Sequence, residues 1–187
     1  MFKTALLTLS LTCTPVLAET NMNSDVDENA FVALMQKEIT NRATARYAIG
    51  AILGRDQPQA ALPFWSSYQA LEALNEEVYA APTAQLGVEP NRFSAWLKGH
   101  SAALYYWLAP KRMITTMAQA TGEYYQELRA DAAQVPARHE DFYQYVLRQE
   151  KVQVEAFTLA DKDDYATASE RLAAFVEAQR NTLVRAE

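Results

Sequence analysis

The chain has 187 residues, of which 50% are hydrophobic and 21% are charged, with a net charge of −6 and a single cysteine. This composition excludes a disordered polypeptide, a disulfide-stabilised miniprotein and a cysteine-rich zinc module. No run of lysine or arginine is present, which argues against a nucleic-acid partner because phosphate binding requires clustered positive charge. At this length we expect one domain with a hydrophobic core of its own.

The first 18 residues have the pattern of a secretory signal peptide. Lys3 precedes a short apolar stretch, and small or aliphatic residues stand before the predicted cleavage site after Ala18. The stretch is too short to cross a bilayer, so we expect a periplasmic or secreted protein with no membrane span after cleavage. Cleavage would remove Cys13, so neither a disulfide nor thiolate chemistry is expected in the single domain of residues 19–187.

Prolines divide the rest of the chain into segments with helical spacing of apolar residues. Because proline and the residue before it disfavour a helix interior, they predict helix ends. The boundary prolines are Pro58, Pro63, Pro82, Pro90, Pro110 and Pro136. The predicted helices cover residues 25–55, 63–80, 90–109 and 111–133, with two more after Pro136 separated by the charged residues 161–164. No stretch has the period-two alternation of a strand.

These segments predict an all-α protein, an up-and-down bundle of about six helices, four of them long core helices. The short connections favour antiparallel neighbours. Gly50 and Gly54 are spaced four residues apart within the first predicted helix, and this spacing predicts a close approach by another helix.

Charged or polar side chains interrupt the apolar face of several predicted helices. Glu38 stands four residues before Arg42, and Glu72, His100 and Glu150 each lie among large apolar residues at helical spacing. Burying a charge is costly unless it is paired or binds a ligand. We therefore predict that these five side chains form a buried polar cluster or ligand-binding site. The alternative is that each is satisfied locally or lies at the edge of its helix face.

A helical bundle with inward glutamates on several helices, here Glu38, Glu72 and Glu150, resembles the ferritin-like carboxylate proteins. In that family single glutamates and Glu-x-x-His pairs hold two metal ions. This chain has Asn75 and Gln153 where those histidines would stand, and amides are poor ligands for iron or manganese. We therefore expect no cofactor. The alternative that the resemblance implies is a di-iron or di-manganese site formed by Glu38, Glu72, Glu150 and His100.

Aromatic residues occur in adjacent groups, and adjacent residues on a helix point about 100° apart, so some members of each group must lie near the surface. Amphipathic rings are favoured in binding surfaces. The predicted partner surface consists of Tyr105, Tyr106, Trp107, Tyr124, Tyr125 and Tyr143. Core packing is the alternative for one member of each group.

The chain lacks the local motifs of common catalytic sites: it has no Gly-x-Ser-x-Gly, no glycine-rich phosphate loop and no His-Glu-x-x-His. We therefore expect a non-catalytic, exported helical bundle that binds either another envelope protein or a small apolar or cationic ligand. An inhibitor, an immunity-type protein and an envelope chaperone all fit this expectation. The alternative function is the ferritin-like metalloprotein described above.

Overall fold

The structure, a computed structural model, describes residues 19–56 and 58–184 of the chain. The predicted signal peptide lies outside the described residues. Six α-helices occupy most of the described part, with two short 3₁₀ segments, Ala132–Gln134 and Ala137–His139, between the fourth and the fifth. The helices are α1 (Glu19–Leu53), α2 (Leu62–Leu86), α3 (Arg92–Leu108), α4 (Pro110–Asp131), α5 (Glu140–Ala160) and α6 (Tyr165–Val184). The described residues contain no strand, and the predicted all-α helical bundle is confirmed.

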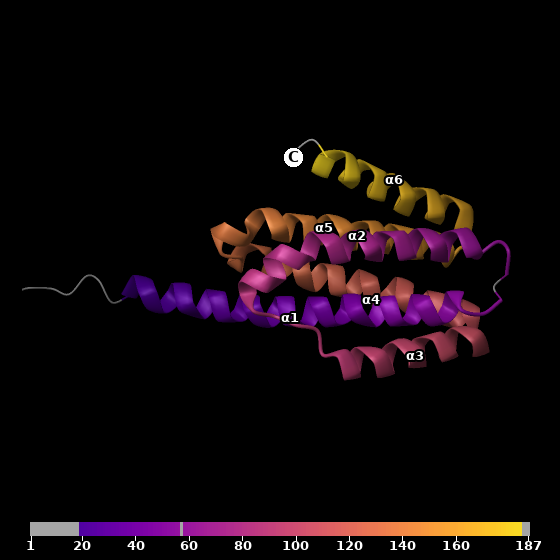
Figure 1. The fold of residues 1–187 in the computed structure, drawn as a ribbon, viewed down its shortest axis with the longest axis horizontal. Helices are drawn as coiled ribbons and strands as arrows, with labels where there is room; N and C mark the ends of the chain where they lie inside the picture. The colour runs from indigo at the N-terminus through magenta and orange to yellow at the C-terminus, as the bar shows by residue number, and fades with distance from the viewer. Residues whose placement is uncertain (1–18, 57, 185–187) are drawn as a thin grey trace, which may run out of the picture.

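Successive helices alternate in direction along the long axis of the molecule, as an up-and-down bundle requires (Figure 1). Helices α1, α2, α4 and α5 contribute most of the buried side chains, α6 packs against α2 and α5, and α3 packs along the outside of α1. Among the described residues, no helix has the length and apolar character needed to cross a membrane.

The helix boundary predicted at Pro82 is wrong. Helix α2 continues through Pro82 to Leu86 and ends at Gly87, whose positive φ of 65° is the left-handed conformation of a helix C-cap. Proline lacks an N–H group, so one backbone hydrogen bond of the helix is missing at Pro82. The helix continues because the fixed backbone φ of proline is compatible with a helix. The other boundary prolines lie at helix ends or in connections.

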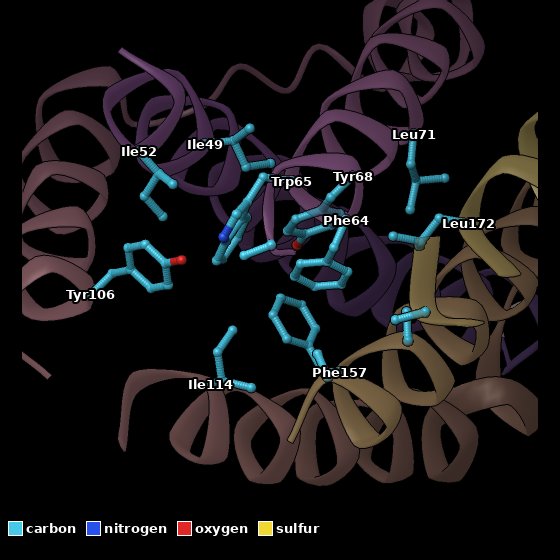
Figure 2. Packing of buried hydrophobic residues seen from close by; sticks show 14 of the residues in the cluster. Ile49, Ile52, Phe64, Trp65, Tyr68, Leu71, Tyr106, Ile114, Phe157 and Leu172 are labelled. Atoms are coloured by element: carbon cyan, nitrogen blue, oxygen red, sulfur yellow. The ribbon is translucent and has the colours of Figure 1, made fainter. Parts of the chain in front are cut away.

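Two hydrophobic clusters fill the bundle, one toward each end. The larger contains Phe64, Trp65 and Tyr68 of α2 in edge-on contact with Phe157 of α5 (Figure 2). The smaller is centred on Met35 of α1 and on residues of α5 between positions 143 and 146. Buried polar residues at positions 38–42, 72–75 and 149–153 stand between the two sets along α1, α2 and α5. The core is therefore apolar at both ends and polar in the middle.

Helix α3 contacts α1 through small residues. Ala95, Gly99 and Ala103 are buried at this contact, and a Cβ atom at Gly99 would lie 2.6 Å from Cβ of Tyr47. Only glycine allows the two backbones to come this close. The close approach predicted at Gly50 is wrong, because nothing lies within 4 Å of a Cβ built there.

Candidate functional site: one buried arginine among three glutamates

Arg42 lies in the middle of the bundle and contacts a carboxylate from each of three helices. Its Nη1 donates to Oε1 of Glu72 at 2.8 Å, and its Nη2 lies 2.9 Å from Oε1 of Glu150. Its Nε lies 3.3 Å from Oε1 of Glu38, one turn earlier on α1, without the alignment of a hydrogen bond. All four side chains are buried. The structure thus brings together four of the five residues of the predicted cluster.

Glu38 is the most fully hydrogen-bonded of the three carboxylates. Its Oε1 accepts from the hydroxyl of Tyr79 at 2.8 Å and from Nε2 of Gln149 at 3.3 Å. Its Oε2 accepts from the hydroxyl of Tyr124 at 2.8 Å. Burial raises the pKa of both tyrosines far above the usual value, and the charge of Glu38 acts in the same direction, so both phenols stay protonated as donors.

Buried amides join the glutamates into a network. Gln149 accepts from Nδ2 of Asn75 at 3.2 Å and donates to Oε1 of Glu150 at 2.9 Å. Gln153 also donates to Gln149, and it accepts from the hydroxyl of Tyr68 at 2.7 Å. Asn75 and Gln153 stand three residues after Glu72 and Glu150, so each is on the same helix face as its glutamate. That spacing is the sequence signal that could have placed both amides in the cluster.

Three carboxylates surround one guanidinium, so the cluster has a formal charge of −2 when all three carboxylates are ionised. Burial raises the pKa of Glu72 to about 7 and that of Glu150 to about 7, against the attraction of Arg42. Burial lowers the pKa of the Arg42 guanidinium. The carboxylates of Glu150, Glu72 and Glu38 raise it by more, so the pKa lies well above its usual value. In Glu72 and Glu150, Oε2 has no hydrogen-bond partner in the described structure.

His100 lies outside this cluster. It is exposed on the outer face of α3, where Nδ1 is 2.9 Å from the carbonyl oxygen of Trp96 and the two rings lie 4.8 Å apart. The prediction that it joins the glutamates is wrong because the large apolar residues of α3 were taken as its buried face. The buried face consists mainly of small residues around Gly99, whereas His100 is exposed beside α1, its ring 6.1 Å from that of Tyr47.

The predicted aromatic partner surface is only partly exposed. Tyr106 and Tyr143 are buried, so the prediction is wrong for both: large rings can fill the core where small neighbours leave room, and the hydroxyl of Tyr143 donates to the carbonyl of Leu128 at 2.6 Å. The hydroxyl of Tyr124 donates a hydrogen bond to Glu38 of the buried cluster. The remaining three are exposed or half-buried and lie on two helices: Tyr105 and Trp107 on α3, and Tyr125 on α4.

A cavity of about 230 Å³ lies beside the cluster, between α1, α4 and their neighbours. Arg42, Glu150 and Tyr124 form part of its wall. The rest is mainly apolar or aromatic and comprises Ala45, Ala48, Ile49, Trp65, Tyr68, Ala102, Met113, Met117, Ala120 and Phe157, with Asn41, Thr44 and Thr121. Glu72 lines a different pocket, of about 210 Å³, between α1 and α2. Glu150 is therefore the cluster carboxylate that faces the apolar cavity.

The side chains of the cluster do not fit a di-metal centre. The guanidinium of Arg42 holds one oxygen of each carboxylate, where a metal ion would have to lie. The positions that would supply imidazole hold Asn75 and Gln153, and His100 is on the surface. Among the described residues, no group of three or more histidine, cysteine, aspartate or glutamate side chains is arranged to hold a metal ion.

The comparisons with known proteins add no relative: no family model, no curated protein and no solved structure matches the chain. The resemblance to ferritin-like proteins thus stays a prediction from the sequence.

Proposed function

We propose that the protein is a non-catalytic binding protein that holds a small amine with an apolar body in the cavity beside Glu150. The observation that carries this proposal is the unpartnered Oε2 of Glu150, a buried carboxylate oxygen on a residue that lines a mostly apolar cavity. An ammonium group would supply the missing donor and the missing positive charge together, since a buried carboxylate is costly unless it is paired.

The walls of the cavity suit the apolar part of such a ligand. Trp65, Tyr68, Tyr124 and Phe157 supply aromatic surface, and a cation near an aromatic face is attracted to it. Arg42 also lines the cavity, but the carboxylates balance its charge, and above about pH 7, where Glu72 and Glu150 ionise, the cluster has an excess of negative charge. The site therefore favours a cation over an anion of the same shape.

Calorimetric titration with three probes of similar shape tests the proposal: 2-phenylethylamine, 2-phenylethanol and phenylacetate. We expect the amine to bind about tenfold or more tightly than the alcohol, because hydrogen bonds to charged groups are worth about 1.5–3 kcal/mol. Phenylacetate should bind most weakly. Amine affinity should rise with pH through about 7, the range in which Glu150 loses its proton.

Two matched variants distinguish the cavity from the cluster as a whole. Glu150→Gln should remove the preference for amine over alcohol, whereas Glu72→Gln should keep it, because Glu72 belongs to the same cluster but does not line this cavity. Equal binding of amine and alcohol, no binding of any probe, or equal effects of the two variants would each contradict the proposal.

A further inference from the structure

The outer face of α3 carries a line of exposed apolar side chains, with His100 near its middle. Of the ten large hydrophobic residues exposed in the described part of the chain, six belong to this one helix. They are Phe93, Trp96, Leu97, Leu104, Tyr105 and Leu108. Residues 93, 97, 104 and 108 recur at the spacing of a single helix face, and the two at the ends, Phe93 and Leu108, are 75% and 76% exposed. An exposed apolar patch of this kind marks an interaction site.

Within the described structure, nothing covers this face. Helix α3 uses its small residues to pack on α1, and its other main contact is with α4, which follows it directly. Figure 1 shows α3 as the outermost helix on its side of the bundle, lying along the long axis of the molecule, with α6 on the opposite side. The line of apolar residues therefore forms a straight ridge that can meet a flat surface along its whole length.

Positive charge accompanies this ridge. The chain has a net charge of −6, yet the segment from Pro90 to Gly122 contains no aspartate or glutamate. Its basic residues are Arg92, Lys98, Lys111 and Arg112, in addition to His100. Lys111 pairs with Asp163, whereas Arg92, Lys98 and Arg112 form no ion pair with any described residue. The ridge thus combines exposed apolar side chains with unbalanced positive charge in an otherwise acidic protein.

We propose that the outer face of α3 docks on the anionic surface of a phospholipid bilayer. Phe93, Leu97, Leu104 and Leu108 would enter the boundary between headgroups and acyl chains, and Arg92, Lys98 and Arg112 would lie among lipid phosphates. A helix with large apolar residues on one face, flanked by basic residues, binds membranes in this way, parallel to the surface and without crossing it. Trp96 and Tyr105 are side chains that favour the interfacial region.

The charges favour a bilayer over a second copy of the chain. Two α3 helices facing one another would bring Lys98 and the neighbouring basic residues of both copies together with no carboxylate in the segment to balance them. Like charges juxtaposed at an interface disfavour association. An acidic protein would satisfy the charges, but a protruding straight ridge needs a matching groove on a protein, whereas a bilayer adapts to it.

Vesicle flotation tests the proposal. The whole chain is produced with its own N-terminal segment, and mass spectrometry verifies that every variant has the same N-terminus as the wild type. We expect the protein to float with vesicles of equal parts phosphatidylcholine and phosphatidylglycerol, and far less with phosphatidylcholine alone. Binding should weaken as salt is added, and tryptophan fluorescence should shift to the blue on binding as Trp96 leaves water.

Surface variants of α3, each with a control on another helix, locate the docking face. The double change Leu97→Ser and Leu104→Ser should lower partitioning about tenfold or more, while Leu62→Ser on α2 leaves it unchanged. Lys98→Gln should lower partitioning to anionic vesicles about fivefold, since each basic residue near such a surface contributes about that factor, and Arg180→Gln on α6 should have little effect.

Several results would overturn the proposal. The wild-type chain could fail to bind anionic vesicles, or the double-leucine variant could partition onto them as strongly as the wild type. Light scattering could also show a dimer that the leucine substitutions convert to monomer. Binding of an acidic protein through α3 in the absence of vesicle binding would also overturn it. None of these outcomes depends on the amine cavity, so this proposal and the proposed ligand function can fail separately.

Discussion

Replacing Glu150 by glutamine should change how the stability of the protein depends on pH. Glu150 and Glu72 are buried carboxyl groups whose pKa burial raises from 4.5 to about 7. Between pH 4.5 and about pH 7, both carboxyl groups are therefore protonated in the folded state and ionised in the unfolded state. Stability from these groups is fully present below about pH 4.5 and is lost as the pH rises through about 7. Glutamine keeps the shape and an acceptor oxygen for Arg42 but cannot ionise.

The size of the effect follows from the shift. A raised pKa of this extent corresponds to on the order of 3 kcal/mol of unfolding free energy for one carboxyl group, most of it lost between pH 5 and pH 8. Because Glu150 is fully buried, solvent screening does not reduce this figure. The Glu150→Gln variant should therefore gain about 2 to 3 kcal/mol relative to the wild type between pH 5 and pH 8.

Urea unfolding followed by far-ultraviolet circular dichroism, at pH 5, 6, 7 and 8 and constant ionic strength, measures this difference. Taking the variant minus the wild type at each pH cancels the titration of the shared groups that lie away from the cluster. A difference that is constant over this range, or one that turns against the variant as the pH rises, would refute the assignment of a raised pKa to Glu150.

Four further substitutions probe the packing of the same bundle. Arg42→Met should destabilise the protein by about 3–5 kcal/mol near neutral pH, and less at pH 5, because it leaves buried carboxylates without a counter-charge. Urea unfolding at the two pH values measures this difference. Tyr124→Phe should cost about 1–3 kcal/mol by removing the 2.8 Å hydrogen bond to Glu38, with the same assay. Gly99→Ala should lower the melting temperature, at a cost of about 1–3 kcal/mol, because position 99 lacks space for a Cβ atom. Gly50→Ala should raise the melting temperature slightly, because a Cβ atom fits there. Equal effects at the two glycines would contradict the packing described for α3.

The polar cluster was predictable because its members interrupt apolar helix faces. Glu38, Arg42, Glu72 and Glu150 could each be identified from periodicity alone, since charge on a face that must be buried requires a partner. Periodicity does not say which partner is chosen. The placement of Arg42 among all three carboxylates depends on how α1, α2 and α5 are rotated and shifted relative to one another, and only the packed bundle fixes those parameters.

Helix α3 shows where the same reasoning fails. Its large apolar residues predict a buried face that would contain His100, but the helix is turned the other way round, with Gly99 against α1. A helix face of small residues indicates close packing of two backbones, and a face of large apolar residues also indicates burial. One sequence does not show which of the two faces is the buried one. The error is informative, because an apolar face that the fold leaves uncovered is a candidate for contact with something else.

Fold stability alone does not account for three buried glutamates around one arginine. Each glutamate comes from a different helix, so a shift of α2 or α5 by one turn, about 5.4 Å, would break its ion pair with Arg42. The cluster can thus set the register of these helices. Register would be served equally well by one charged pair and neutral amides, since Gln149 already accepts a hydrogen bond from Asn75 of α2 and Gln153 accepts one from Tyr68 of α2. The excess negative charge is not needed for it, and since Glu150 adjoins the cavity, a bound cation is the partner that would balance it.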